Sequence, residues 1–289
     1  MHVDSTRAVL ALGGDDRIPF LQGILTQDVT LLREDRGLFA ALLSPQGKIL
    51  HDMFLLCLSD CILLDTDASQ KEALLKRLTM YKLRAKVTLE DASVRWRVAY
   101  RTQATHAAVG HITRKKEKLV LTDPRAGELG DRIYLPPQEE AAHTASLDDY
   151  HRHRIRLGIP GTQDLDNDVA IDAGYDALNA ISFTKGCYVG QEVTARMHYK
   201  NINRRGFYCV EADGDLPAPG AAIEADGQLL GTLRGSKGHL GLAMVKFDAV
   251  EGALETRKRP VIGTQAVQLR PPAWLQPKLA QFRAAQEKQ

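Results

Sequence analysis

The chain has 289 residues, of which 44% are hydrophobic and 26% are charged, as in a soluble globular protein of two or three domains. Its 38 basic and 36 acidic residues give a net charge of +2, and this balance argues against a dedicated nucleic-acid or membrane-surface binder. We find no signal-peptide pattern at the N-terminus and no apolar run of membrane-spanning length. We therefore expect a cytoplasmic protein whose partners are small molecules or other proteins.

The first half of the chain predicts a sheet with a covering helix. Apolar segments within residues 38–58 flank a Ser-Pro-Gln-Gly turn at 44–47, which is typical of a hairpin. An amphipathic helix is expected over 69–83, where Ser69 and Glu72 have the spacing of a capping box. Further short strands are expected at 86–91, 94–100, 118–124 and 130–136. This order favours an α+β fold with helices on one face of an antiparallel sheet.

The second half begins with helical signals and ends with strands. Helices are expected at 146–157, closed by Gly158, and at 191–200. Between them, an aspartate-rich stretch lacks the glycine and glutamate of a calcium loop, so we interpret it as a solvated acidic loop. From Phe207 onward we expect a small all-β module without a convincing internal helix, followed by a short polar helix after Pro277.

Four cysteines are too few for a disulfide framework in a chain of this size. Cys57, Cys61 and Cys209 lie in strand-like segments and are interpreted as buried small hydrophobes, and no zinc-ligand spacing is present. Cys187 differs, because it lies between two glycines, two residues after Lys185 and shortly before a predicted helix. These surroundings favour a thiolate that acts as a nucleophile, a metal ligand or a redox-sensitive group. The alternative is a loop cysteine with a packing role.

The stretch "SFTKGCYVGQEVTAR", followed by "NRR", resembles the signature of the YgfZ family. These are folate-binding proteins related to the T-protein (aminomethyltransferase) of the glycine cleavage system. The segments "FLQGILTQDV", "ALLSPQGKILHDMFLL", "YKLRAKVTLED" and "RIRLGIP" are similar to family segments in the same order. The resemblance therefore extends over most of the chain.

The resemblance implies an α+β protein with two ferredoxin-like units and a C-terminal β-barrel arranged as a three-domain ring. In that arrangement the first unit is discontinuous, because its N-terminal part packs with the segment that carries the motif. The implied divisions are 1–48 with 142–203 for the first unit, 49–141 for the second, 204–275 for the barrel and 276–289 for the tail.

The resemblance also implies a function: binding of tetrahydrofolate or a folate derivative, and a role in the assembly or repair of iron-sulfur proteins. The expected partners are reduced folate and iron-sulfur carrier or client proteins, and neither nucleic acid nor a membrane is expected. Cys187 is the implied functional thiol, and no resident metal site is expected. The residues that the resemblance and the local charge suggest for the cofactor are Lys185, Tyr188, Gln191, Glu192, Arg196, Asp52 and Arg205.

A folate-dependent aminomethyltransferase, or another one-carbon transferase, is the alternative. The T-protein motif resembles Leu-Arg-Leu-Glu-Ala-Gly, and Arg156 stands here where its glutamate would be. A guanidinium only donates hydrogen bonds, so it cannot replace a carboxylate that accepts them from a pterin. The T-protein Asp-Asp pair is His51-Asp52 here, and T-protein lacks the Gly-Cys-Tyr of the motif. Three roles for Cys187 remain open: a thiol of an accessory factor, a catalytic nucleophile, or a structural residue of a folate-sensing interaction protein.

Overall fold

The computed structural model of the chain describes residues 3–139, 144–200 and 202–286. The chain folds into two compact units. The first consists of residues 1–150 and 178–193, and the second of residues 151–177 and 194–289. Segments that are distant in the sequence therefore meet in each unit.

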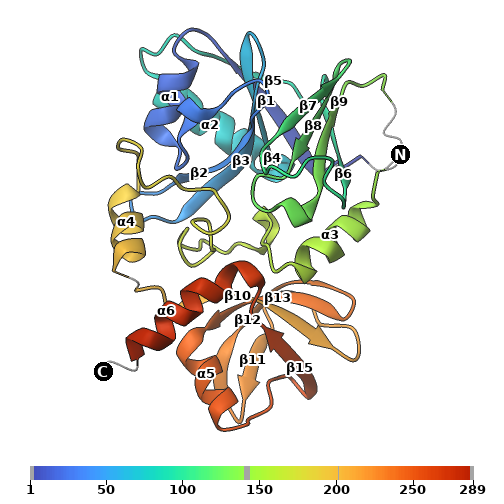
Figure 1. Ribbon diagram of the computed structural model, residues 1–289, viewed down its shortest axis with the longest axis vertical. Helices are drawn as coiled ribbons and strands as arrows, with labels where there is room; N and C mark the ends of the chain where they lie inside the picture. Colours follow the sequence, from blue (N-terminus) through green and yellow to red (C-terminus); the bar gives the residue numbers. More distant parts are fainter. Residues whose placement is uncertain (1–2, 140–143, 201, 287–289) are drawn as a thin grey trace. The chain divides into compact units, whose positions relative to one another are not determined.

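A five-stranded antiparallel sheet is the centre of the first unit, with the strand order β2-β3-β4-β1-β5. The hairpin predicted at 38–58 is the pair β2–β3, in which Ala41 lies opposite Asp52. Figure 1 shows α1 and α2 on one side of this sheet, where Phe20 and Leu21 of α1 and Leu74 of α2 join its core. The elements are β1 (Arg7–Gly13), α1 (Arg17–Ile24), β2 (Leu38–Leu43), β3 (Ile49–Cys57), β4 (Cys61–Asp67), α2 (Lys71–Lys82) and β5 (Thr88–Asp91), with 3-10 turns at Val29–Leu31 and Ala68–Gln70.

A second, four-stranded antiparallel sheet completes this unit, with the order β6-β9-β8-β7. Its own apolar cluster is small, with Ala99, Val120, Ile133 and Leu135. The domain boundary expected between residues 48 and 49 falls inside the β2–β3 hairpin. The two strands of this hairpin pair with each other and belong to one sheet. The strands are β6 (Arg97–Arg101), β7 (Ile112–Lys115), β8 (Lys118–Thr122) and β9 (Asp131–Leu135), with a 3-10 turn at Gly127–Leu129.

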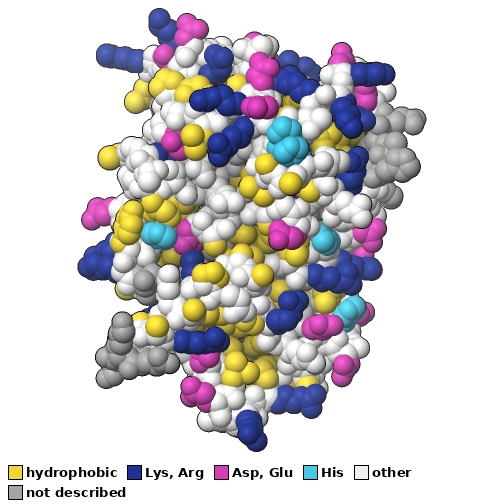
Figure 2. All heavy atoms as spheres, viewed as in Figure 1, with side chains coloured by type: hydrophobic (Ala, Val, Ile, Leu, Met, Phe, Trp, Pro, Cys, Tyr) yellow, Lys and Arg dark blue, Asp and Glu magenta, His cyan; other side chains and the backbone are white. Residues whose placement is uncertain are grey.

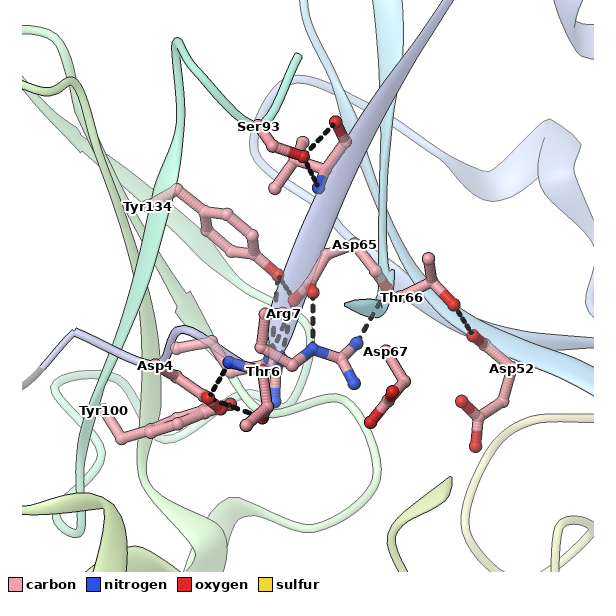
Figure 3. A network of polar contacts seen from close by, with 12 residues as sticks. Asp4, Thr6, Arg7, Asp52, Asp65, Thr66, Asp67, Ser93, Tyr100 and Tyr134 are labelled. Atoms are coloured by element: carbon pink, nitrogen blue, oxygen red, sulfur yellow. Dashed lines mark hydrogen bonds and ion pairs between the residues drawn. The ribbon is translucent and has the colours of Figure 1, made fainter. Parts of the chain in front are cut away.

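A buried charge network joins the two sheets of the first unit (Figure 3). The Asp65 carboxylate, on β4, accepts hydrogen bonds from Arg7 Nε at 2.8 Å and from Arg132 Nη2, on β9, at 2.6 Å. Tyr134 donates its hydroxyl to the same carboxylate at 2.8 Å. The Arg132 guanidinium also lies 3.7 Å from the centroid of the Phe54 ring. Burial alone would raise the pKa of Asp65, but the two arginines hold it below its ordinary value. The Asp65 carboxyl group is therefore ionised in the folded protein at neutral pH.

The second unit contains a closed β-barrel with the strand order β10-β13-β12-β11-β14-β15. This confirms the predicted α+β fold with a C-terminal barrel. Helices α5 and α6 pack on the barrel, where Phe247 and Phe282 belong to its apolar core (Figure 1). The elements are β10 (Arg205–Ala212), β11 (Ala222–Ala225), β12 (Gln228–Lys237), β13 (Leu240–Lys246), α5 (Phe247–Glu255), β14 (Val261–Ile262), β15 (Gln265–Arg270) and α6 (Gln276–Gln286), with 3-10 turns at Thr162–Asp164 and Ala273–Leu275.

Two predicted helices occur close to their expected limits, namely α3 (Leu147–Arg156) and α4 (Gln191–Tyr199). Gly158 has a φ of +69°, which suits the residue after a helix end and agrees with the predicted stop. The expectation of no helix within the β module was wrong, because α5 lies between β13 and β14. Helix α1 was not predicted either.

Two local interpretations were wrong because side chains bind partners that the pattern does not reveal. The predicted Ser69–Glu72 capping box is absent: Asp67 accepts from the Ser69 N–H at 2.9 Å and caps a 3-10 turn, and α2 begins only at Lys71. The acidic loop is not simply solvated. Buried Asp164 pairs with Arg154 at 2.5 Å, and buried Asp168 pairs with Arg234 at 3.2 Å.

The charged side chains agree with the nearly neutral composition. Figure 2 shows basic and acidic groups mixed over the face that it draws, without a large area of one sign. Within the described ranges, no helix is long and apolar enough to cross a membrane.

Replacing Asp65 by asparagine tests the network between the sheets. Asp65→Asn leaves two buried guanidinium groups without their anion, so we expect a loss of about 3–5 kcal/mol in the free energy of unfolding at pH 7, measured by urea denaturation. Because the folded-state pKa of Asp65 is lowered, this difference is fully present above the ordinary carboxyl pKa of 3.8 and narrows as the pH falls below it.

The matched control is Asp60→Asn, at an exposed position between β3 and β4. Similar urea midpoints for the two variants at pH 7 would contradict a stabilising role of the Asp65 network.

Candidate functional site

The motif segment is anchored by Lys185, whose ammonium group lies at the end of α1. It donates to the carbonyl oxygens of Gln22 at 2.7 Å, Leu25 at 2.6 Å and Gln27 at 3.1 Å. The last carbonyls of a helix have no partner within the helix, and a cation there also interacts favourably with the helix dipole. Lys185 therefore closes α1 from a position about 160 residues further along the chain.

The Lys185 side chain is buried, and its ammonium group donates only to groups of the protein that the structure describes. Lys185 is only 8% exposed, and desolvation lowers its pKa to about 8, so the ammonium is still charged at neutral pH. An ammonium group has three hydrogens, and three carbonyl oxygens accept them. The Nζ atom also lies 5.1 Å from the centroid of the Tyr188 ring, which is itself buried. Lys185 and Tyr188 thus form the buried side of the motif loop.

Gly190 fixes the other end of the loop. Its φ is +84°, and a Cβ atom there would lie 2.5 Å from the carbonyl oxygen of Ser44, in the β2–β3 turn. The position therefore requires glycine both for its backbone conformation and for the close approach to the turn. Gly186 differs, since a Cβ atom there would meet nothing within 4 Å. Before the motif, the Thr26 hydroxyl donates to the Ala180 carbonyl at 2.6 Å and ties the incoming chain to the same region.

Cys187 lies between these anchors and is exposed. The other cysteines have different surroundings. Cys209 is buried, as predicted, and its thiol contacts the Ile155 carbonyl at 3.5 Å. Cys57 and Cys61 are half-buried instead of fully buried, and burial raises the pKa of Cys61 to about 11. Cys187 is thus the one exposed cysteine of the chain, and all four lie among the described residues.

Asp52 and His51 occupy neighbouring positions on β3 and are 5% and 4% exposed. The Asp52 backbone carbonyl accepts from the Thr66 hydroxyl at 3.0 Å, and Figure 3 shows the two residues side by side. Burial and the nearby Arg77 lower the pKa of His51, which keeps its imidazole neutral at pH 7. The pair therefore consists of a buried aspartate side chain and a neutral imidazole ring.

The remaining predicted cofactor residues divide between the two units. Gln191 and Glu192 form the first turn of α4 and belong to the first unit, together with the motif loop and Asp52. Arg196, in the last turn of α4, and Arg205, the first residue of β10, belong to the second unit and are exposed. The structure therefore brings Lys185, Tyr188 and Cys187 together in one loop and leaves the two arginines in the other unit.

The partners of Lys185 and the role of Asp65 were not predicted from the sequence. Nothing near Lys185 in the sequence points to carbonyl groups about 160 residues away. A signal did exist for Asp65, because an aspartate inside the apolar run "CILLDTD" is expected to be buried and therefore paired.

The C-terminal part of the chain, residues 204–277, matches the family model described as the C-terminal beta-barrel domain of CAF17. Over most of its length the chain is similar to two mitochondrial proteins named as iron-sulfur cluster assembly factor IBA57. The protein from Mus musculus is 32% identical, with 90% of this chain and 82% of the relative covered. The protein from Homo sapiens is 33% identical, with 87% and 78% covered.

Among solved structures, the chain is similar to the glycine cleavage system aminomethyltransferase T from Bartonella henselae. The TM-score is 0.68 with 14% sequence identity, and the match covers 94% of this chain and 84% of that one. At this level of identity the likeness shows a shared fold.

Removing the Lys185 ammonium tests the anchoring of the loop. Lys185→Met deprives three carbonyl groups of their common donor, so we expect the free energy of unfolding to fall by about 2–4 kcal/mol, measured by urea denaturation at pH 7. Lys76→Met, at an exposed position on α2, is the matched control. An equal change in both variants would show that Lys185 does not stabilise this region.

Proposed function

Because this chain belongs to the IBA57 family of iron-sulfur cluster assembly factors, we propose that it acts in the assembly or repair of iron-sulfur proteins. The family is shown by relatives that are more than 30% identical over most of both chains. The finer likeness to the YgfZ family, which rests on the motif around Cys187, belongs to the same proposal.

The exposed thiol of Cys187 is the observation that supports this proposal most directly. Lys185 and Gly190 anchor its loop on both sides, so the thiol is presented at a defined position. A thiolate is a soft ligand that suits iron and sulfide. A thiol in this position can therefore take part in the transfer of iron or of a cluster.

A single thiol cannot hold a cluster alone, since such clusters require about four ligands. Among the described residues, no group of three or more His, Cys, Asp or Glu side chains could hold a metal ion. We therefore propose that a carrier or client protein supplies the other ligands while Cys187 contributes one. The cluster is then cargo shared between two proteins.

Reduced folate is the proposed small-molecule ligand, and the predicted cofactor residues do not fit it equally well. Lys185 uses its three donors on carbonyl groups, and Tyr188 is buried in the same packing. Asp52 fits better, because a carboxylate can accept hydrogen bonds from pterin N–H groups. Gln191 and Glu192 remain further candidates in the same unit.

We favour an accessory factor over an aminomethyltransferase. The likeness to aminomethyltransferase T concerns the fold alone. Arg156, in the last turn of α3, has a donor-only side chain where the T-protein motif has a carboxylate. The cellular compartment stays a prediction: the sequence suggests the cytoplasm, whereas the two relatives are named as mitochondrial.

Substitution of the exposed thiol tests the proposed role. In a strain that lacks its own protein of this family, we expect the wild-type chain to restore iron-sulfur enzyme activity under oxidative stress. Cys187→Ala should restore about a tenth of it or less, since the substituted protein lacks a ligand. Cys57→Ala, which removes a half-buried thiol, is the control and should restore activity fully.

Protein abundance is measured in every strain, so that a loss of function is separated from a loss of protein. Equal rescue by Cys187→Ala would show that the thiol is not required and would contradict its proposed role as a ligand. Failure of the wild-type chain itself would contradict the proposed function.

The folate proposal has its own test in Asp52→Asn. An amide accepts fewer hydrogen bonds than a carboxylate of the same shape and carries no charge, so we expect the affinity for tetrahydrofolate to fall at least about tenfold. Anaerobic titration calorimetry measures this affinity, with Asp60→Asn as the exposed control. Unchanged affinity in Asp52→Asn would remove this residue from the ligand site.

A further inference from the structure

The second unit contains a cavity of about 400 Å³ between α6, the end of α4 and the loop that precedes residue 178. Pockets that bind small organic molecules have volumes of about 300–1,000 Å³. None of the residues predicted for folate or for the functional thiol lines this cavity. It is therefore a separate feature of the barrel unit.

One side of the cavity is apolar. Ile171 and Phe282 form part of this wall and are almost fully buried, and Met197 borders it from α4. Tyr199 also lines the cavity, although 68% of its surface is exposed. An exposed aromatic ring beside an apolar wall suits a flat ring of a ligand, because ring faces and edges pack favourably.

The polar side of the cavity is built on Asp176, whose side chain is 6% exposed. Lys278 donates to this carboxylate at 2.5 Å, and His198 Nδ1 lies 3.4 Å from its other oxygen. The side chains of Lys278 and His198 are 17% and 39% exposed. The ammonium and the imidazole are therefore more accessible to a ligand than the carboxylate is.

Lys278 has the capacity for a ligand contact. Its ammonium group donates to Asp176 and to the Ile171 carbonyl at 3.2 Å. These are its two acceptors within the described part of the chain, and an ammonium carries three hydrogens. One hydrogen is left for an acceptor in the cavity.

The charge around the cavity favours an anion. The lining that the structure describes contains one cation, Lys278, and one anion, Asp176. Arg204 adds a positive charge beside the lining, because its guanidinium lies 5.3 Å from the centroid of the Phe282 ring. Asp172 lies near Lys278 but also interacts with Arg205, and burial raises the pKa of Asp172 to about 6.

We propose that this cavity binds a small aromatic anion, with a carboxylate or phosphate at Lys278 and a ring against the apolar wall. The anion accepts the remaining hydrogen of the Lys278 ammonium, and charge-assisted hydrogen bonds of this kind are short and strong. The aromatic ring of the ligand packs between Met197, Tyr199 and Phe282. This proposal is independent of Cys187 and of the proposed function.

A methyl NMR titration of the full-length protein tests the proposal. The chain has five methionines, and the methyl signal of Met197 reports on the cavity wall. The probes are 2-naphthoate and its uncharged counterpart 2-naphthamide. We expect a saturable shift of the Met197 signal with 2-naphthoate below about 1 mM, and at least about tenfold weaker binding of 2-naphthamide.

Two variants localise the binding. Lys278→Met should weaken 2-naphthoate binding by about tenfold and leave 2-naphthamide binding unchanged. Because this change also removes a partner of Asp176, a second variant leaves that pair intact. Gln281→Trp fills the cavity from an exposed position on α6 and should abolish the Met197 shift, whereas Ala280→Trp, on another face of the helix, should not.

The outcomes separate the elements of the proposal. The absence of a Met197 shift up to about 10 mM 2-naphthoate would overturn it. Equal binding of the two probes would overturn the selectivity for anions. A shift that persists in Gln281→Trp would place the probe elsewhere and would also overturn the proposal. Iron-sulfur enzyme activity enters none of these measurements, so failure here is distinct from failure of the proposed function.

Discussion

The buried carboxylate of Asp65 is the constraint on which the first unit depends. It binds Arg7 of its own sheet and Arg132 of the second sheet, with side chains that are at most 10% exposed. A buried ion pair contributes little net stability compared with apolar packing, but the loss of one partner is costly. The network therefore specifies which strands face each other, because another pairing would leave a buried charge without a partner. The small apolar cluster of the second sheet makes this specification more important.

The same sheet supports the motif loop. Strand β4 carries Asp65 and pairs with β3, and the turn between β2 and β3 meets Gly190. Helix α1 packs on the sheet through Phe20 and Leu21 and receives the Lys185 ammonium at its end. Both anchors of the loop thus depend on one packed layer. A change in that layer can displace the Cys187 loop without touching the cysteine itself.

The sequence predicts well those features that depend on local signals. Helix α3 ends where Gly158 permits a positive φ, and α4 begins just after Gly190. Turn residues separate the strand-like segments after Phe207, so the C-terminal β module was also predictable. These features depend on neighbours within a few residues.

Features that depend on distant partners were missed. Helix α1 contains Pro19 and Gly23, which lower helix propensity, and α5 contains Gly252, so packing on a sheet or barrel decides both. The aspartates of the acidic loop were misread because a partner such as Arg234 lies 66 residues from Asp168. Lys185 was read as a charge beside Cys187, whereas its acceptors lie near residue 25.

The environments of Cys209 and Cys187 differ, and the difference follows from the residues around Cys187. Cys209 is buried between strand and helix, its thiol contacts backbone carbonyls, and burial raises its pKa. Packing alone would favour the same surroundings for Cys187. Instead the buried positions of the loop are taken by Lys185 and Tyr188, and the cysteine between them is exposed. A lysine buried on three carbonyls and a glycine with positive φ anchor the loop on both sides of the exposed thiol. The proposed site, whose ligands are shared with a partner protein, requires this arrangement. The partner protein can bind only a thiol that is accessible and held in a fixed position.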